Sequence, residues 1–361
     1  MHNSFKLNGI YYSNENLKSL AHNFIKEGLA YEQVVGQFLL DWLNDSDFVS
    51  VNTSGSTGIP KHIKIKKQAM VNSAIATGDF FKLQPENTAL HCLPTNFIAG
   101  KMMLVRAMVL GLELDIVEPK SQLVFDYDKA YHFCAMIPLQ LQNTLKHCDN
   151  IETMIVGGVS VSKTLIDDIH NIKSTVYETY GMTETVTHIA VKQLNNFSLL
   201  RGEPTKRSVK SYFKTLLNVS ISQNESGCLV IYAPKLSEEK IITNDIVKIH
   251  SDTEFEWLGR FDNVINSGGV KLFPEQIEVK LQKIIQQRYF IASEKDNTLG
   301  EKIILVIESE NIDLNVISNE VRNLITLDKF EIPKAIYCVK QFIETSSGKI
   351  QRKKTLGLLK C

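Results

Sequence analysis

Short apolar runs alternate with helical patterns over a long part of this chain, from about Phe48 to Ile231. The clearest unit has an apolar run at 89–93, a helical pattern at 98–109 and another apolar run at 112–117. Strands that alternate with helices are typical of an α/β domain whose sheet is covered by helices. The same rhythm returns in two further units, at 133–137 with 139–146 and at 153–156 with 162–172.

The pattern changes toward the C-terminus, which predicts a second domain. The chain has 361 residues, more than the roughly 100–200 usual for one domain. After Arg201 the pattern is one of short strands with turn residues, and a compact segment begins beyond Gly259. We therefore predict a large N-terminal α/β domain with layered sheets, residues 1–259, and a small C-terminal α+β domain, residues 260–361. In the small domain we expect helices at 274–285 and 316–325 and strands at 289–292, 303–307 and 335–339.

Composition is that of a globular protein without a strong charge. The formal net charge is zero, with 43% hydrophobic and 22% charged residues. Nucleic acids and anionic membranes usually require a basic face, so we expect neither as a partner. The N-terminal residues lack the pattern of a signal peptide, and no apolar run is long enough to span a bilayer, which predicts a cytoplasmic protein. The six cysteines form no C-x-x-C pair, so neither a zinc site nor a disulfide framework is expected.

The string VNTSGSTGIPKHIKI, Val51 to Ile65, is rich in glycine and hydroxyl side chains. Exposed backbone N–H groups beside such side chains form a nest for an anion, and phosphate is the obvious one. The spacing differs from that of the phosphate loop that precedes a helix. Residues 62–66 alternate polar and apolar, which predicts a strand and places the loop inside a hairpin. An ordinary surface turn is the alternative for a loop of this composition.

The string from Thr53 to Lys61 resembles the phosphate-binding signature of the adenylate-forming superfamily, which contains acyl-CoA synthetases, adenylation domains and luciferases. The resemblance implies that this loop holds the β- and γ-phosphates of ATP. The residues implied are Thr53, Ser54, Gly55, Ser56, Thr57, Gly58 and Lys61.

Two further strings resemble motifs of that superfamily. ETYGMTET, Glu178 to Thr185, is similar to its Y-G-x-T-E segment. The resemblance implies that Tyr180 and Gly181 lie at adenine, that Thr183 meets phosphate and that Glu184 helps to hold Mg²⁺, an ion that prefers carboxylate oxygen. VGGVS is similar to the glycine pair of the adenine pocket, which implies that role for Gly157 and Gly158. Taken alone, either string is also compatible with an ordinary loop at the end of a strand.

The segments ITNDIVKI and WLGRFDNVINSGGVKLFPEQIE resemble the region that joins the two domains in the superfamily. The resemblance implies that Asp245 binds the ribose hydroxyls, that Arg260 contacts ribose or phosphate and that Asp262 is the hinge residue. Two positions depart from the usual pattern. Asn244 replaces a glycine, and Gln276 stands where glutamate is commoner.

ETSSGKIQRKK resembles the G-K-I-x-R terminus of the superfamily, which places Lys349 on the catalytic lysine. A lysine in a basic surface run is usually solvated, and we keep that interpretation for Lys353 and Lys354. The resemblance implies ATP, Mg²⁺ and CoA as reactants and cofactor, and a small domain that rotates about the hinge between adenylation and thioester formation.

The segment HCLPTNFIAGKMMLVRAMVLG, from residue 91, bears on the acid substrate. It resembles a family segment that contains a histidine where Phe97 stands and an aromatic residue where Asn96 stands. Arg106 lies on an otherwise apolar helix, where burial without a partner would be costly. A structural salt bridge is one explanation; the other is an anchor for a second carboxylate of the substrate. The match from Gly100 onward is to o-succinylbenzoate-CoA ligases of menaquinone biosynthesis, in which an arginine has this place.

We therefore predict an acid–thiol ligase for a small-molecule carboxylic acid, o-succinylbenzoate above others, with Arg106, Phe97 and Gly100 at the acid. Most relatives have a longer N-terminal domain, so a less elaborate acid pocket is expected. Another aryl- or fatty-acyl-CoA ligase and a carrier-loading adenylating enzyme remain alternatives. A non-catalytic nucleotide-binding module is disfavoured by the retention of Glu184 and Lys349. A homodimer is left open.

Overall fold

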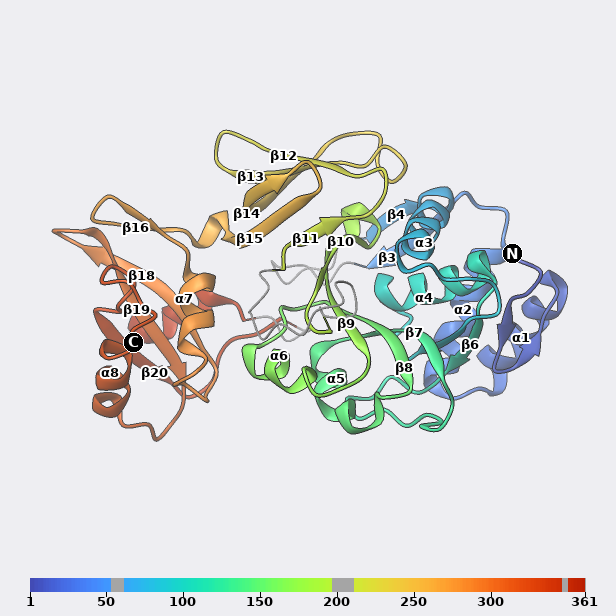
Figure 1. Cartoon of the computed structure of the whole chain (residues 1–361), viewed down its shortest axis with the longest axis horizontal. Coiled ribbons are helices and arrows are strands. Elements are labelled where there is room, and N and C mark those ends of the chain that lie inside the picture. The colour runs from blue at the N-terminus through green and yellow to red at the C-terminus, as the bar shows by residue number, and fades with distance from the viewer. Residues whose placement is uncertain (53–61, 197–210, 346–349, 361) are drawn as a thin grey trace.

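The computed structural model describes residues 1–52, 62–196, 211–345 and 350–360. Figure 1 shows an elongated molecule with a large N-terminal body, which contains a long mixed sheet, and a smaller C-terminal body with its own sheet. Within the described ranges, no helix is both long and apolar enough to cross a membrane. The fold is the α/β arrangement with a smaller α+β part that the sequence predicts.

The N-terminal part of the chain supplies the last two strands of the long sheet, β1 and β2, and a separate hairpin, β3 and β4. A β-hairpin at residues 48–66 leads directly into α3, and its register pairs Val49 with Ile65 and Asn52 with His62. The strand predicted at 62–66 and its place in a hairpin are therefore confirmed, whereas the loop at 53–61 lies outside the described residues. The elements are β1 (Lys6–Leu7), β2 (Ile10–Tyr11), α1 (Asn14–Glu27), α2 (Ala30–Leu43), β3 (Phe48–Asn52), β4 (His62–Lys66) and α3 (Lys67–Phe81).

The middle of the chain forms the parallel part of the long sheet. Strands β6, β5, β7, β8 and β9 lie side by side and run in the same direction. Parallel strands are usually buried on both faces, which fits the nearly continuous apolar run and burial of β7, whereas β9 alternates between buried and partly exposed residues. The elements are β5 (Thr88–His91), α4 (Ile98–Leu110), β6 (Glu113–Ile116), β7 (Tyr131–Met136), α5 (Pro138–Thr144), η1 (Leu145–His147), β8 (Ile151–Val156), α6 (Lys163–Ile169), β9 (Thr175–Gly181) and η2 (Thr183–Thr185).

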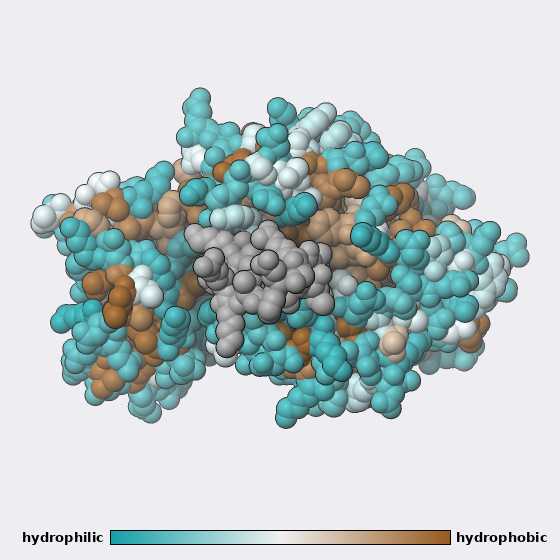
Figure 2. Space-filling model, viewed as in Figure 1, coloured by the Kyte–Doolittle hydropathy of each residue, from teal (hydrophilic) through white to brown (hydrophobic). Residues whose placement is uncertain are grey.

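Antiparallel strands continue the sheet beyond β9. In the described residues the full order is β12-β13-β14-β15-β11-β10-β9-β8-β7-β5-β6-β1-β2. Figure 2 shows a mostly hydrophilic surface in this view, with one apolar patch between β10 and α3 and others on the C-terminal body at the left. The added strands are β10 (His188–Gln193), β11 (Phe213–Thr215), β12 (Ser220–Gln223), β13 (Cys228–Tyr232), β14 (Ile241–Ser251) and β15 (Glu254–Arg260).

The C-terminal body has a sheet of order β17-β16-β19-β18, with β20 paired to β19. Helices α7 and α8 are shorter than the patterns at 274–285 and 316–325 suggested, and α8 starts two residues earlier because Asp313 caps it. The domain boundary near residue 260 remains a prediction. The elements are η4 (Phe261–Asn263), β16 (Ile265–Ser267), β17 (Val270–Leu272), α7 (Pro274–Leu281), β18 (Tyr289–Asp296), β19 (Gly300–Glu308), α8 (Leu314–Arg322), β20 (Ala335–Val339), α9 (Arg352–Gly357) and η5 (Leu358–Lys360).

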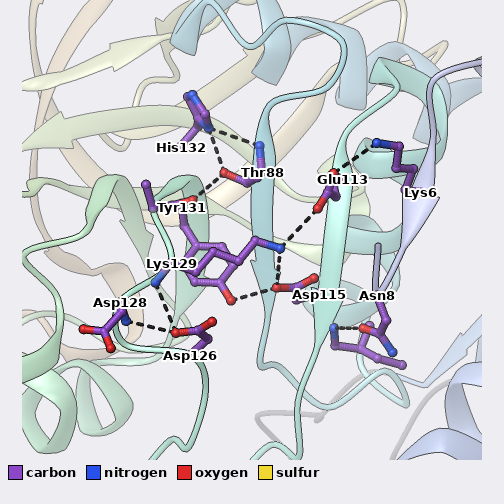
Figure 3. Close-up of polar contacts among 12 residues, drawn as sticks. Lys6, Asn8, Thr88, Glu113, Asp115, Asp126, Asp128, Lys129, Tyr131 and His132 are labelled. Atoms are coloured by element: carbon purple, nitrogen blue, oxygen red, sulfur yellow. Dashed lines mark hydrogen bonds and ion pairs between the residues drawn. The ribbon is translucent and has the colours of Figure 1, made fainter. Parts of the chain in front are cut away.

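A polar network joins neighbouring strands near their N-terminal ends (Figure 3). The Nζ atom of Lys129 lies 2.8 Å from Asp115 Oδ2 and 3.2 Å from Glu113 Oε1, and the Tyr131 hydroxyl donates to Asp115 at 2.8 Å. Burial first, and then the hydrogen-bonded Asp115, raise the pKa of Tyr131, so its hydroxyl keeps its proton. Because this network stands away from the C-terminal ends of the strands, we interpret it as structural.

Candidate active site

The C-terminal ends of the parallel strands gather most of the described residues that the sequence singles out. The chain leaves β5 toward Phe97 and Gly100, leaves β8 at Gly157 and leaves β9 toward Glu184. Because β5, β7, β8 and β9 are parallel neighbours, these exits lie along the same edge of the sheet. In open α/β sheets, ligands bind at this edge.

Close contacts or a left-handed backbone favour glycine at three positions along this edge. A Cβ on Gly157 would collide with Thr179 Oγ1, and Gly158 has a φ of +90°, which disfavours other residues. A Cβ on Gly181 would collide with the carbonyl oxygen of Thr187, the residue before β10. These contacts explain the glycines by packing alone. Their places at adenine therefore remain predictions.

The short helix η2 presents the predicted phosphate and metal residues. Thr183 is half-buried and Glu184 is exposed, so the carboxylate is available to solvent and to a ligand. No group of three or more His, Cys, Asp or Glu side chains that could hold a metal was found in the described part of the chain. A single carboxylate nevertheless suits Mg²⁺, which is usually bound through one or two carboxylates together with the phosphates of a substrate.

Asp245 is the centre of a second cluster, built from β9, β14 and β15. It is buried and accepts hydrogen bonds from the Tyr180 hydroxyl at 2.7 Å and from Trp257 Nε1 at 3.1 Å. Arg260 Nη1 lies 3.6 Å from the same carboxylate, since Arg260 is the cross-strand partner of Asp245. Burial raises the pKa of Tyr180, and Asp245 raises it further, so the hydroxyl remains a donor.

The cluster brings together Tyr180, Asp245 and Arg260, which the sequence analysis assigns to ATP, and it adds a residue that the sequence reasoning missed. The ring of Tyr180 packs edge-on against Phe255, with centroids 5.2 Å apart, while its hydroxyl holds Asp245. Stacking of this ring on adenine stays a prediction. Trp257 was not assigned a role, although its place on a strand after Asp245 and before Arg260 was a usable signal.

The two departures from the usual motif make contacts at the junction of the two bodies. Asn244 Nδ2 donates to Asp262 Oδ2 at 3.1 Å, so it holds the predicted hinge residue. Gln276 Nε2 donates to the carbonyl oxygens of Trp257 at 3.2 Å and Leu258 at 3.1 Å. An ionised glutamate has no proton to donate to these carbonyls. The amide therefore links α7 to β15 in this orientation.

Arg106 is the largest fully buried side chain of the described residues and is 1% exposed. It lies on α4, which is buried from Gly100 to Met108 and ends at Gly111, a residue in the left-handed region at φ +75°. Burial lowers the pKa of Arg106 to about 9, so the guanidinium stays positively charged at neutral pH.

The contacts of the Arg106 guanidinium are neutral. Nε lies 3.4 Å from Thr77 Oγ1, and Nη2 lies 3.4 Å from both Thr187 Oγ1 and His188 Nδ1. Nη1 is 3.6 Å from the sulfur of Met103. None of the ion pairs found in the described ranges includes Arg106. The salt-bridge explanation therefore gains no support from this part of the chain.

The remaining predicted residues have clear positions or lie outside the described part. Phe97 precedes α4 and is 43% exposed, and Gly100 packs so closely on the Pro94 carbonyl that a side chain would collide. Residues 53–61 and Lys349 lie outside the described residues, so their sites stay predictions. Sequence reasoning missed Thr77, Thr187 and His188, because they approach Arg106 from α3 and from the segment that begins β10.

A large sheet with parallel strands at its centre, candidate binding residues at the C-terminal ends of those strands and a smaller second body define a two-part α/β protein. Residues 35–222 match the family described as AMP-binding enzyme. The chain belongs to this family, which confirms the adenylate-forming resemblance and the prediction of an enzyme.

Individual relatives agree with this assignment. An acyl-CoA synthetase (AMP-forming)/AMP-acid ligase II-like protein from Dyadobacter fermentans is 34% identical, with a TM-score of 0.60, and the match covers 95% of this chain and 98% of that one. The 2-succinylbenzoate–CoA ligase of Haemophilus influenzae is 24% identical over 83% of this chain and 68% of its own length. The o-succinylbenzoate CoA synthetase of Bacillus subtilis, in complex with its acyl-adenylate intermediate, has the same fold at 17% identity, with a TM-score of 0.69 over 84% of this chain and 68% of that one.

Proposed function

We propose that the protein joins o-succinylbenzoate to coenzyme A in an ATP-dependent reaction that passes through an acyl-adenylate. The observation that carries the choice of acid is Arg106, a buried cation whose described partners are all neutral. A second carboxylate on the substrate would supply the missing negative charge. The family membership and the names of the relatives support the ligase chemistry.

The proposed reaction has two steps. First, a carboxylate oxygen of the acid attacks the α-phosphorus of ATP, which forms a mixed anhydride and releases pyrophosphate. The thiol of CoA then attacks the acyl carbon, a thioester forms, and AMP leaves. Negative charge spreads over the transferring phosphoryl group in the first step, so the protein contributes mainly positioning and fixed positive charge.

Each part of the candidate site has a role in this proposal. The loop from Thr53 to Lys61 holds the departing pyrophosphate, and Lys349 contacts the carboxylate and the α-phosphate. Asp245 binds the ribose hydroxyls, where its two existing donors orient the carboxylate. Glu184 would hold Mg²⁺, which supplies positive charge at the phosphate oxygens.

Product analysis with a panel of acids tests this function. The purified protein is incubated with MgATP, CoA and one of o-succinylbenzoate, benzoate, a medium-chain fatty acid or acetate, and pyrophosphate and thioester are followed separately. We expect both products with o-succinylbenzoate alone. Turnover of another acid would keep the ligase chemistry and refute the substrate. If no acid releases pyrophosphate, the non-catalytic nucleotide-binding alternative gains support.

Asp262→Pro is expected to spare adenylation and to slow thioester formation by roughly 10-fold or more, because proline fixes φ near −65° at the proposed hinge. The measurement is single-turnover pyrophosphate release, followed by conversion of supplied acyl-adenylate and CoA to thioester. Asp262→Ala is the matched control, since it removes the contacts to Asn244 and Arg260 without fixing the backbone. A proline variant with both steps at wild-type rates would remove the hinge assignment.

A further inference from the structure

The side chain of His188 closes a ring of polar contacts around Arg106. His188 is 5% exposed at the start of β10, with Nδ1 3.4 Å from Arg106 Nη2 and Nε2 3.4 Å from Thr77 Oγ1. Thr77 Oγ1 also lies 3.4 Å from Arg106 Nε. Threonine and histidine therefore approach two different nitrogens of the same guanidinium.

The proton of the Thr77 hydroxyl decides which histidine nitrogen carries hydrogen. Thr77 Oγ1 donates to the Ser73 carbonyl oxygen at 2.9 Å, one turn back along α3. A hydroxyl has a single proton, so the same oxygen acts as an acceptor toward Arg106 and His188. Nε2 of His188 is then the N–H donor, and Nδ1 offers its lone pair to Arg106 Nη2.

The ring holds the guanidinium without neutralising it. Burial, reinforced by the positive charge of Arg106, lowers the pKa of His188 well below its usual range, so the imidazole is neutral. An acidic residue in place of His188 would form a buried ion pair with Arg106 and neutralise its positive charge. A neutral acceptor orients Nη2 and leaves the net positive charge in place. The described contact of Nη1 is the sulfur of Met103, which is only a weak acceptor.

We propose that His188 is a positioning residue that sets the preference of this enzyme for a dicarboxylate. As an uncharged acceptor it holds the guanidinium of Arg106 in place for the substrate carboxylate that does not react. This inference rests on the proposed function, because it assigns a partner to the anchor that the function requires.

The test compares three substitutions at one position in the full chain. His188→Gln keeps a neutral acceptor, His188→Leu removes it, and His188→Asp replaces it with a charge. Pyrophosphate release is measured with o-succinylbenzoate and with two monocarboxylates of related skeleton, 3-benzoylpropionate and 2-acetylbenzoate. His132→Gln is the control, because His132 bonds Thr88 near the opposite ends of the strands.

We expect His188→Leu and His188→Asp to raise the KM for o-succinylbenzoate roughly 10-fold or more, the size of a hydrogen bond to a charged group. The kcat, the KM for ATP and the activity with the better monocarboxylate are expected to stay within about threefold, and His188→Gln to stay near wild type. Thr77→Val, which removes the shared acceptor, is expected to repeat the selective rise if His188→Leu fails to fold.

Three results would overturn the inference. An unchanged KM for o-succinylbenzoate in His188→Leu would show that the contact has no role in binding. A parallel rise for the monocarboxylates would show a general structural defect. An equal KM for o-succinylbenzoate in His188→Gln and His188→Asp would show that charge at this position is irrelevant. A wild-type protein that does not adenylate o-succinylbenzoate would refute the proposed function as well, which separates the two failures.

Discussion

Replacement of Arg106 with leucine is expected to raise the KM for o-succinylbenzoate by roughly 100-fold and to leave the KM for ATP unchanged. Loss of one partner from a buried, hydrogen-bonded charge pair costs about 2–5 kcal/mol, and here the second partner would be the substrate. Steady-state kinetics with o-succinylbenzoate and 3-benzoylpropionate measure the effect. The monocarboxylate is expected to change little, because it offers no second carboxylate to Arg106.

The free energy of unfolding of Arg106→Leu tests the role of Arg106 independently of the kinetics. If Arg106 belonged to a buried salt bridge, its removal would leave an unpaired acid and cost about 3–5 kcal/mol of the free energy of unfolding. Since the described contacts are neutral, we expect Arg106→Leu to change that free energy by less than about 2 kcal/mol. Urea unfolding without substrate decides between these values.

Two further variants serve as controls for the kinetic effect. Arg106→Lys keeps the charge and loses the planar fork, so an intermediate KM is expected. Arg322→Leu removes an exposed arginine from α8 in the C-terminal body and is expected to have wild-type kinetics. A dicarboxylate KM that is unchanged in Arg106→Leu would rule out the anchor. A parallel loss of activity with o-succinylbenzoate and 3-benzoylpropionate would indicate a structural role for Arg106 instead.

The sequence predicted the local parts of this fold because short-range periodicity determines them. The alternation at 62–66 identified β4, and the helical pattern at 98–109 identified α4, which extends from Ile98 to Leu110. The helix at 274–285 was predicted too long. It ends at Leu281, and Ile284 and Ile285 follow in a turn, although their apolar spacing continues the helical pattern.

The surroundings of Arg106 could not be read from local pattern. An arginine inside an apolar helix indicates burial and therefore the need for a partner. Which residues become that partner depends on topology, since Thr77 lies 29 residues before Arg106 and His188 lies 82 residues after Arg106. The same holds for Trp257, whose contact with Asp245 follows from the pairing of β14 with β15.

Arg352, three residues beyond the proposed catalytic Lys349, is anchored in the C-terminal body. Arg352 forms a two-pronged pair with Glu278 of α7, at 2.8 Å from Nη1 to Oε1 and 2.9 Å from Nη2 to Oε2. Burial raises the pKa of Glu278 to about 7, although Arg352 opposes this shift. The pair fixes the start of α9 on α7. Since Arg352 is three residues beyond Lys349, movement of this body would carry the lysine with it.

Lys349→Ala is therefore expected to reduce adenylation by roughly 100-fold or more, because a fixed positive charge at the transferring phosphoryl group is lost. Conversion of supplied acyl-adenylate and CoA to thioester is expected to continue near the wild-type rate, since the lysine acts only in the first step. Both half-reactions are measured separately in single-turnover experiments. Lys353→Ala, an exposed lysine of α9, is the matched control. Equal loss of both half-reactions in Lys349→Ala would contradict a role confined to adenylation, and with it the division of the two steps between two orientations of the C-terminal body.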